Sequence, residues 1–346
     1  MRIRVNVVAL STLLLLAGNV GAAAFNGLYA FGDSLSDAGS NPSAVISMYK
    51  LLGNNCDPLH PCSPIGPYVE GRISNGPVAS EHLATALFPE GVTTTNFRSY
   101  AVAGASTGIG NSGDEGGATE SGQFNLPGMK QELERYMTDS AGAADPDALY
   151  FVWGGGNDYV TNDSPLAAAQ NISGYVNELA GAGARHFLVP NLSDLSLTPS
   201  VRAEGDAARA EAQAFSVVFN TELASQLGQV SSNFPTADIF QFDTYAFLND
   251  VVMNPGDYGF TDVENPCVSL LFSCGNPDAY LHWDDFHPTT RAHAVIASAF
   301  ASAVPEPRIG AMLIMGLVMV GMVANRRRKS EPLRTTGTGT AGGFRC

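Results

Sequence analysis

Three residues in two short segments have the types and spacing needed for nucleophilic catalysis. Ser34 lies in FGDSLSDAGSN, directly after an apolar run at residues 27–31 that is typical of a short buried strand. Asp284 and His287 lie three residues apart in WDDFHPT. A carboxylate that holds one nitrogen of an imidazole leaves the other nitrogen free to take a proton from a serine hydroxyl. The three residues are therefore candidates for nucleophile, orienting acid and general base.

The candidate acid and base are expected on a single helical turn. The last helical pattern of the domain begins at residue 283 and continues into an apolar stripe. Residues three apart lie on the same face of a helix, so the carboxylate of Asp284 should reach the ring of His287. We therefore predict that both side chains lie on the first turn of this helix.

Glycine-containing segments follow the ends of two further predicted strands. The apolar runs at residues 97–102 and 148–153 lead into AGA, which contains Gly104, and into GGND, which contains Asn157. The carboxyl ends of parallel strands share one edge of a sheet, and ligands bind there. Ser34 follows the first predicted strand in the same way, so the three loops should meet.

Apolar runs alternate with helical patterns along most of the chain. The predicted strands are residues 27–31, 97–102, 148–153, 185–189 and 237–242, and the predicted helices include residues 43–52, about 165–182 and about 203–227. Strands that are apolar throughout indicate a parallel sheet covered on both faces. We predict an α/β fold, a three-layer α/β/α sandwich with a mostly parallel five-stranded sheet, in one domain over residues 25–303. Residues 103–123 are expected to form a loop, and the residues that follow the fifth strand, 243–278, a loop-rich insertion.

Seven segments occur in the order found in the GDSL lipase/esterase family, also called SGNH hydrolases, which this chain resembles. They are FGDSLSDAGSN, GRISNG, SYAVAGA, GGND, NLSDLSLTP, NPGDYGFTDV and WDDFHPT. The resemblance implies a flavodoxin-like fold in which Ser34 is the nucleophile, His287 the base and Asp284 its orienting acid. It also implies that Gly104, Asn157 and the Ser34 N–H form an oxyanion hole, which would stabilise a developing negative charge.

The resemblance also implies an activity. We expect a serine esterase or lipase that hydrolyses carboxylic esters through an acyl-enzyme, with no metal and no cofactor. Its substrate would be a small ester or an acylated polysaccharide or lipid. Two alternatives stay open, namely an acyltransferase that uses the same triad and a non-catalytic, carbohydrate-binding surface protein.

Two other segments imitate catalytic motifs. GASTG around Ser106 fits the G-x-S-x-G elbow of another hydrolase fold, but that elbow requires a helix immediately afterwards, and glycines follow here instead. Asp57 and His60 repeat the D-x-x-H-P spacing inside the short loop between Cys56 and Cys62. We expect Ser34 to be the nucleophile and the Asp57–His60 pair to lie on the surface.

Both ends of the chain have the character of sorting signals. Arg2 and Arg4 precede an apolar run and three alanines, which indicates a secretory signal peptide over residues 1–24. At the other end, VPEP, an apolar segment at residues 309–324 and the sequence RRRK resemble the bacterial Pro-Glu-Pro carboxy-terminal sorting signal (PEP-CTERM), here residues 304–329.

This resemblance implies a transient membrane anchor. The helix over residues 309–324 would hold the precursor in the inner membrane until an exosortase-type enzyme removes it. Residues 330–346 would form a cytoplasmic tail, since basic clusters stay on the cytoplasmic side; such a tail is a departure from the usual signal, which ends soon after its arginines. We therefore expect export to the periplasm, the cell surface or the medium.

Charge and cysteines fit an exported protein. Residues 25–304 contain nine Lys and Arg against 31 Asp and Glu, a net charge of −22, which predicts no affinity for nucleic acid or anionic membrane surfaces. Short separations predict the disulfides Cys56–Cys62 and Cys267–Cys274, both near the site entrance, with Cys346 left free.

Overall fold

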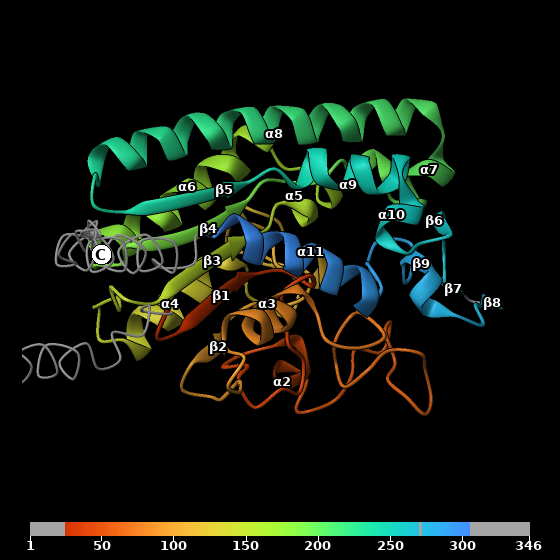
Figure 1. Ribbon diagram of the computed structural model, residues 1–346, viewed down its shortest axis with the longest axis horizontal. Helices are drawn as coiled ribbons and strands as arrows, with labels where there is room; N and C mark the ends of the chain where they lie inside the picture. Colours follow the sequence, from red (N-terminus) through yellow and green to blue (C-terminus); the bar gives the residue numbers. More distant parts are fainter. Residues whose placement is uncertain (1–24, 270–271, 305–346) are drawn as a thin grey trace, which may run out of the picture. The chain divides into compact units, whose positions relative to one another are not determined.

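A five-stranded sheet forms the centre of the computed structural model, which describes residues 25–269 and 272–304 (Figure 1). Its strands are β1 (Leu28–Gly32), β2 (Phe97–Ser99), β3 (Leu149–Trp153), β4 (His186–Pro190) and β5 (Asp238–Phe242). They lie in the order β2-β1-β3-β4-β5, and every neighbouring pair is parallel. The chain order reverses between β1 and β3, and ligands of open α/β sheets bind at the carboxyl ends of strands at such a point.

Helices cover both faces of the sheet, because its strands are apolar on both sides. In β3, Val152 packs into one buried cluster and Phe151 into the other. The first cluster includes residues of α4 (Met129–Asp139), α6 (Pro165–Gly181) and α8 (Asp206–Asn233), and the second includes residues of α3 (Ala79–Leu87) and α11 (Thr290–Ala303). Figure 1 shows α11 crossing the near face of the sheet. The predicted three-layer α/β/α fold is confirmed.

The helix expected over residues 43–52 is much shorter than predicted. Only α2 (Met48–Leu51) is helical, with the hydroxyl of Ser47 capping its start. The preceding residues instead run beside the end of β2, where the Val45 N–H donates to the carbonyl of Ser99 over 2.7 Å. Backbone pairing at this edge therefore replaces the first turns of the predicted helix.

The helix predicted from residue 203 to residue 227 is interrupted and extended. It divides into α7 (Pro199–Glu204) and α8 at Gly205, whose φ of +99° is incompatible with continuing a right-handed helix. The segment expected to be loop-rich contains two helices, α9 (Thr244–Met253) and α10 (Pro255–Tyr258). It also contains three short strands, β6 (Asp262–Pro266), β7 (Val268–Ser269) and β8 (Phe272–Ser273). The 3₁₀ turn η3 (Pro277–Ala279) lies at its end, and the strand β9 (Tyr280–His282) follows.

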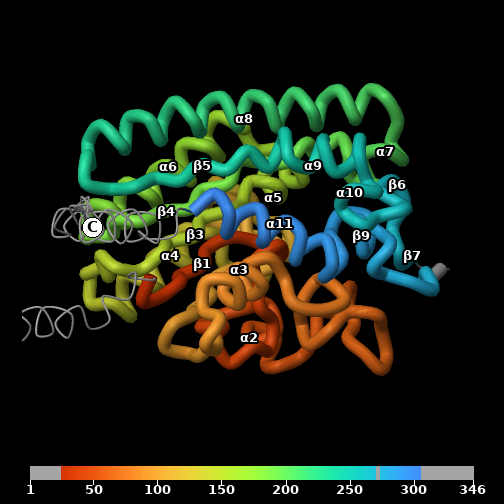
Figure 2. The backbone as a smooth tube through the Cα atoms, in the orientation of Figure 1, coloured from red at the N-terminus to blue at the C-terminus, as the bar shows by residue number. Residues whose placement is uncertain are grey.

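The remaining short elements lie in the loops that follow the strands. They are η1 (Ser112–Asp114), α5 (Gly156–Val160) and η2 (Leu195–Leu197). Figure 2 shows the long loop between α2 and α3 at the same end of the molecule as α10, β7 and β9. These segments build the surroundings of the site.

The signal peptide predicted at residues 1–24 lies outside the described residues, as do the sorting signal predicted at residues 304–329 except for Val304, the membrane helix at residues 309–324 and the tail at residues 330–346. Among the helices of residues 25–269 and 272–304, none has the length and apolarity that crossing a membrane requires.

Candidate active site

Ser34 lies in a tight turn immediately after β1. Gly32 ends the strand with a φ of +151°, and a Cβ atom there would lie 2.1 Å from the carbonyl oxygen of Trp153, so only glycine fits. The carbonyl of Asp33 then accepts the N–H groups of Ser36 and Asp37, both over 2.9 Å. The turn directs the Ser34 side chain, which is 8% exposed, into a cavity at the strand ends.

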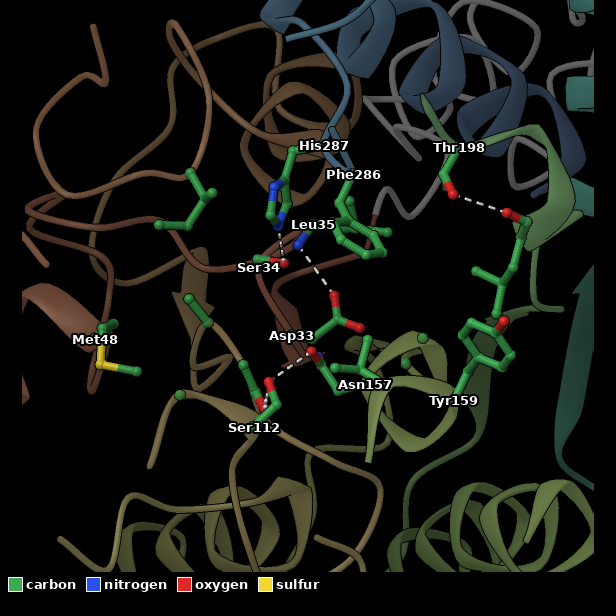
Figure 3. A pocket seen from close by; sticks show the side chains of 18 of the residues that line it. Asp33, Ser34, Leu35, Met48, Ser112, Asn157, Tyr159, Thr198, Phe286 and His287 are labelled. Atoms are coloured by element: carbon green, nitrogen blue, oxygen red, sulfur yellow. Dashed lines mark hydrogen bonds between the residues drawn. The ribbon is translucent and has the colours of Figure 1, made fainter. Parts of the chain in front are cut away.

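The structure brings Ser34, His287 and Asp284 into one hydrogen-bonded row, of which Figure 3 shows the contact between Ser34 and His287. The Nε2 atom of His287 lies 2.9 Å from Oγ of Ser34, and its Nδ1 lies 2.9 Å and 3.0 Å from the two carboxylate oxygens of Asp284. The spacing of three was correctly interpreted as proximity, but the prediction of a helical turn was wrong, because α11 begins only at Thr290.

A side-chain-capped turn brings Asp284 and His287 together in place of the helix. Oδ1 of Asp284 accepts the backbone N–H groups of Phe286 and His287 over 2.9 Å and 2.7 Å. The Trp283 N–H donates to the carbonyl of His287 over 2.6 Å and closes the loop. An aspartate commonly captures the N–H groups of the residues that follow it, which fixes this turn without a helix.

Burial and ion pairing act in opposite directions on this pair. Burial opposes ionisation of Asp284, but the adjacent His287 ring and the loop N–H groups outweigh it and hold the Asp284 pKa below its usual range. Burial also disfavours the imidazolium form of His287, yet the Asp284 carboxylate raises the His287 pKa above its ordinary value of 6.5. The pair is thus arranged to strengthen the basicity of Nε2, the atom that faces Ser34.

Hydrogen-bond donors surround the space beside Ser34. Within the described residues, neither the Ser34 N–H nor the Gly104 N–H has a hydrogen-bond acceptor. The side-chain amide of Asn157, in the first turn of α5, donates one N–H to the carbonyl of Ala105 over 3.0 Å and accepts from the hydroxyl of Ser112 over 2.9 Å. An amide nitrogen carries two hydrogens, so one remains for another acceptor.

The conformation of Gly104 also requires glycine. Its φ is +81°, and a Cβ atom would lie 2.3 Å from Oδ1 of Asn111. Three donors at the ends of β1, β2 and β3, next to a serine paired with a histidine, are the arrangement that acyl transfer needs for a tetrahedral oxyanion.

Comparison with known proteins agrees with this geometry. The sequence model of the family described as GDSL-like Lipase/Acylhydrolase matches residues 28–300. The chain belongs to the GDSL-like lipase/acylhydrolase family. It is an ester-hydrolysing serine hydrolase.

Plant proteins are among the similar relatives of this GDSL hydrolase. A GDSL esterase/lipase of Arabidopsis thaliana is 27% identical over 330 residues, which cover 82% of this chain and 83% of the relative. The anther-specific proline-rich protein APG of Brassica napus is 26% identical over 316 residues, covering 78% and 69%. A solved lipolytic G-D-S-L family protein from Veillonella parvula covers 79% of this chain and 94% of its own at 14% identity and a TM-score of 0.40, a similarity too distant to support an argument.

The cavity of the GDSL hydrolase extends to both sides of Ser34. Its volume is about 460 Å³, and most of the side chains that line it are apolar. Figure 3 shows Tyr159 and Thr198 on one side of Ser34 and Met48 on the other. Asp33 also lines the cavity, and burial raises the pKa of its carboxyl to about 6.

Of the two segments that imitate catalytic motifs, the one with Ser106 lies away from the cavity and the one with Asp57 and His60 lines it. Ser106 is fully buried outside the cavity, and its hydroxyl donates to the carbonyl of Gly110 over 2.8 Å. The expectation that Asp57 and His60 lie merely on the surface was wrong, because both residues line the cavity. The Cys56–Cys62 disulfide closes the loop that contains both residues.

Three supporting residues escaped the sequence analysis. The hydroxyl of Tyr68 donates to Oδ2 of Asp284 over 2.9 Å. The buried carboxylate of Glu132, in α4, accepts the N–H groups of Gly32 and Val102, and that of Asp37 accepts the Ala103 N–H over 2.8 Å. Asp37 lies within the FGDSLSDAGSN motif, but no motif marks the other two residues, since Tyr68 meets its partner 216 positions away and Glu132 sits in an ordinary amphipathic pattern.

Both predicted disulfides form in the structure, but only one of them borders the site. Cys56 and Cys62 close a loop whose residues line the cavity, whereas Cys267, Cys274 and their neighbours do not line it. Residues 25–269 and 272–304 contain no group of three or more His, Cys, Asp or Glu side chains that could hold a metal ion.

Proposed function

We propose that this protein hydrolyses carboxylic esters through a covalent acyl intermediate on Ser34. The observation that carries the proposal is the unbroken contact from Asp284 through His287 to Ser34, with Nε2 to Oγ at 2.9 Å. A serine hydroxyl becomes a useful nucleophile only beside a base that is itself oriented by a third group.

The roles of the residues follow from their atoms. Nε2 of His287 takes the Ser34 proton as Oγ attacks the ester carbonyl, and the same nitrogen then returns the proton to the leaving alcohol. The Ser34 N–H, the Gly104 N–H and the free N–H of Asn157 would hold the oxyanion, each contributing about 3–4 kcal/mol to stabilisation of the transition state. Water, activated by His287, then releases the acid and restores Ser34.

The cavity supports an acyl ester as the substrate class. Leu192, Leu195 and Val201 form an apolar wall that suits an acyl chain, and the cavity volume of about 460 Å³ suits a small ester or the end of an acylated lipid or polysaccharide. An acyltransferase would use the same atoms with an alcohol in place of water, and a non-catalytic binding protein would need none of them.

We also propose that the protein is exported, which rests on the sequence of residues 1–24 and on the paired cysteines. Two disulfides within residues 25–304 favour an oxidising compartment outside the cytoplasm. Removal of the segment that follows Val304 by an exosortase-type enzyme would release the domain or anchor it again at the surface.

A panel of p-nitrophenyl esters of increasing acyl length, with acetylated polysaccharide beside it, tests the proposed function. We expect release of acid that disappears in Ser34→Ala. Transfer of the acyl group to added alcohol faster than to water would assign the acyltransferase activity. Absence of turnover together with saccharide binding would instead assign the carbohydrate-binding role.

A further inference from the structure

A second Asp–His pair faces the cavity of the catalytic triad. Nδ1 of His60 lies 2.7 Å from Oδ2 of Asp57, and both residues line the cavity together with Ser34 and His287. The ring centroids of His60 and His287 are 6.1 Å apart, with the rings at 82°. Two Asp-x-x-His-Pro segments, more than 200 residues apart in sequence, therefore meet at one site.

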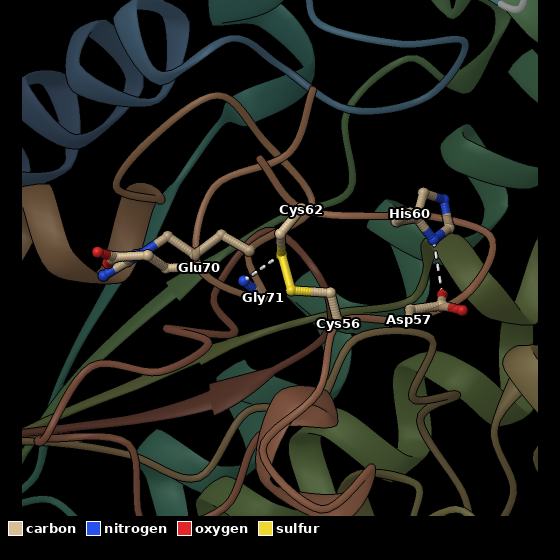
Figure 4. Close-up of a disulfide and its surroundings, with 7 residues drawn as sticks. Cys56, Asp57, His60, Cys62, Glu70 and Gly71 are labelled. Atoms are coloured by element: carbon tan, nitrogen blue, oxygen red, sulfur yellow. Dashed lines mark hydrogen bonds and ion pairs between the residues drawn. A yellow bond between two sulfur atoms is a disulfide. The ribbon is translucent and has the colours of Figure 1, made fainter. Parts of the chain in front are cut away.

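Covalent and packing contacts hold the Asp57–His60 pair in place at the site. Figure 4 shows Asp57 and His60 in the loop that the Cys56–Cys62 disulfide closes, and Sγ of Cys62 accepts the Gly71 N–H over 3.0 Å. The ring of Tyr68 packs edge-on against His60 at 5.0 Å, and the Tyr68 hydroxyl binds the carboxylate of Asp284. His60 thus has a fixed position relative to the triad.

The contact with Asp57 determines what His60 can bind. A carboxylate accepts hydrogen bonds only, so Nδ1 of a neutral His60 carries the hydrogen and Nε2 presents a lone pair. Within residues 25–269 and 272–304, Nε2 of His60 has no hydrogen-bond partner, and the side chain is 28% exposed. Such a nitrogen accepts a hydrogen bond from a donor, and a hydroxyl group is the donor that an alcohol can carry. Asp33 and Asp57 both line the cavity and would repel an anion.

The position beside His287 indicates which part of an ester His60 meets. Nε2 of His287 must lie against the oxygen of the departing alcohol in order to protonate it. With the ring of His60 6.1 Å from that of His287, groups attached to the alcohol lie within reach of His60. The apolar wall that contains Leu195 and Val201 is left for the acyl chain.

We propose that Nε2 of His60 accepts a hydrogen bond from a hydroxyl group on the alcohol portion of the substrate. The enzyme would then select esters of polyhydroxylated alcohols, such as glycerol or a sugar, over esters of simple alcohols. This inference rests on the proposed esterase function and adds the substrate class to it.

The test compares three esters of the same acid, namely its glycerol ester, its glucose ester and its propyl ester. The acid is the one that the enzyme prefers in the p-nitrophenyl series. The measured quantity is the ratio of kcat/KM for each hydroxylated ester to that for the propyl ester. We expect a ratio of about ten or more in the full-length wild-type protein, as one added hydrogen bond implies. A high ratio for glycerol alone or for glucose alone identifies the source of the hydroxyl.

Two variants and a matched control assign this selectivity to His60. His60→Phe keeps a ring against Tyr68 but removes both nitrogens, and we expect its ratio to fall about tenfold. Asp57→Asn leaves the tautomer of His60 unfixed and should lower the ratio by a smaller factor. If His60→Phe does not fold, Asp57→Asn serves as the test variant in its place. His186→Phe is the control, because His186 pairs with Asp238 over 3.2 Å and is also 28% exposed, but it starts β4 and does not line the cavity.

The outcomes separate this inference from the proposed function. A wild-type ratio near one, with normal hydrolysis of the propyl ester, overturns the role of His60 and leaves the esterase intact. An unchanged ratio in a folded His60→Phe also overturns it. If no ester is hydrolysed and a fluorophosphonate does not label Ser34, the proposed function fails and this inference fails with it.

Discussion

Every polar atom of the Asp284 carboxylate has a partner. Oδ1 accepts the N–H groups of Phe286 and His287, Oδ2 accepts the Tyr68 hydroxyl, and both oxygens face the ring of His287. A carboxylate with this many donors stays ionised and fixes the tautomer of the imidazole that it contacts. The ionisation of the Asp284–His287 pair should therefore determine how activity changes with pH.

The pH profile should have an acid limb above pH 6.5. His287 must be neutral to accept the Ser34 proton, so activity is lost as the pH falls through the His287 pKa. Asp284 raises that pKa above 6.5 despite the opposing effect of burial. A plot of kcat/KM against pH for a p-nitrophenyl ester measures it.

Replacing the carboxylate should move this limb. In Asp284→Asn the charge that raises the His287 pKa is gone, so we expect the limb at lower pH and a loss in kcat of about 10³- to 10⁴-fold. An acid limb that stays in place in Asp284→Asn would show that His287 is not the group that titrates.

Glu132 links the end of β1 and the segment that follows β2 to the helix α4. From α4 its carboxylate accepts the Gly32 N–H over 2.9 Å and the Val102 N–H over 3.1 Å. Gly32 ends the strand that leads to Ser34, and Val102 precedes Gly104. The geometry of nucleophile and oxyanion donors thus depends on one buried side chain.

We expect Glu132→Gln to lower kcat/KM by about tenfold to a hundredfold. Glutamine has one acceptor oxygen, so one of the two N–H groups would face an NH₂ group, at a cost of about 1–3 kcal/mol. The cost is smaller where that group is the Val102 N–H, because it also donates to the carbonyl of Gly32 over 3.1 Å. Glu134→Gln is the control, since Glu134 lies on the exposed side of α4 and its carboxylate pairs with Lys130 over 2.7 Å. Equal, small effects of both variants would show that the strand ends hold their positions without Glu132.

The sequence predicts the sheet and the triad because both have local signals. Residues 148–153 form a continuous apolar run that is typical of a buried strand, and a D-x-x-H spacing brings its side chains together in a helix or in a capped turn. Contacts between distant segments have no such signal. Nothing near Tyr68 indicates Asp284 as its partner, and the inward direction of His60 depends on how its loop folds over the strand ends.

The two disulfides should differ in their effect on catalysis. Replacing Cys56 and Cys62 by serine frees the loop of Asp57 and His60, so we expect a higher KM and a loss of about 2 kcal/mol in the free energy of unfolding. Replacing Cys267 and Cys274 should cost similar stability but leave KM unchanged. Kinetics and denaturant unfolding of both double variants measure this, and a rise in KM only in the second would contradict it.

The catalytic domain should function without the segments that precede residue 25 and follow residue 303. Residues 25–304 contain the buried clusters on both faces of the sheet and the complete triad, and they carry a net charge of −22. We expect a protein of residues 25–303 to be soluble and as active as the full chain, because its charge keeps the molecules apart. Cell fractionation and esterase assays of both forms test this. Insoluble, inactive truncated protein beside freely soluble full-length protein would show that the segment after residue 303 belongs to the fold.

In the proposed mechanism Ser34 carries the acyl group, and the most direct test is to trap that group. Brief mixing with a p-nitrophenyl ester, acid quenching and mass spectrometry of the peptides should locate one acyl adduct on Ser34. Ser34→Ala should form no adduct, and its activity should fall by at least about 10³-fold. Ser106→Ala should still form the adduct and keep most of its activity. An adduct on Ser106, or full activity in Ser34→Ala, would contradict the account.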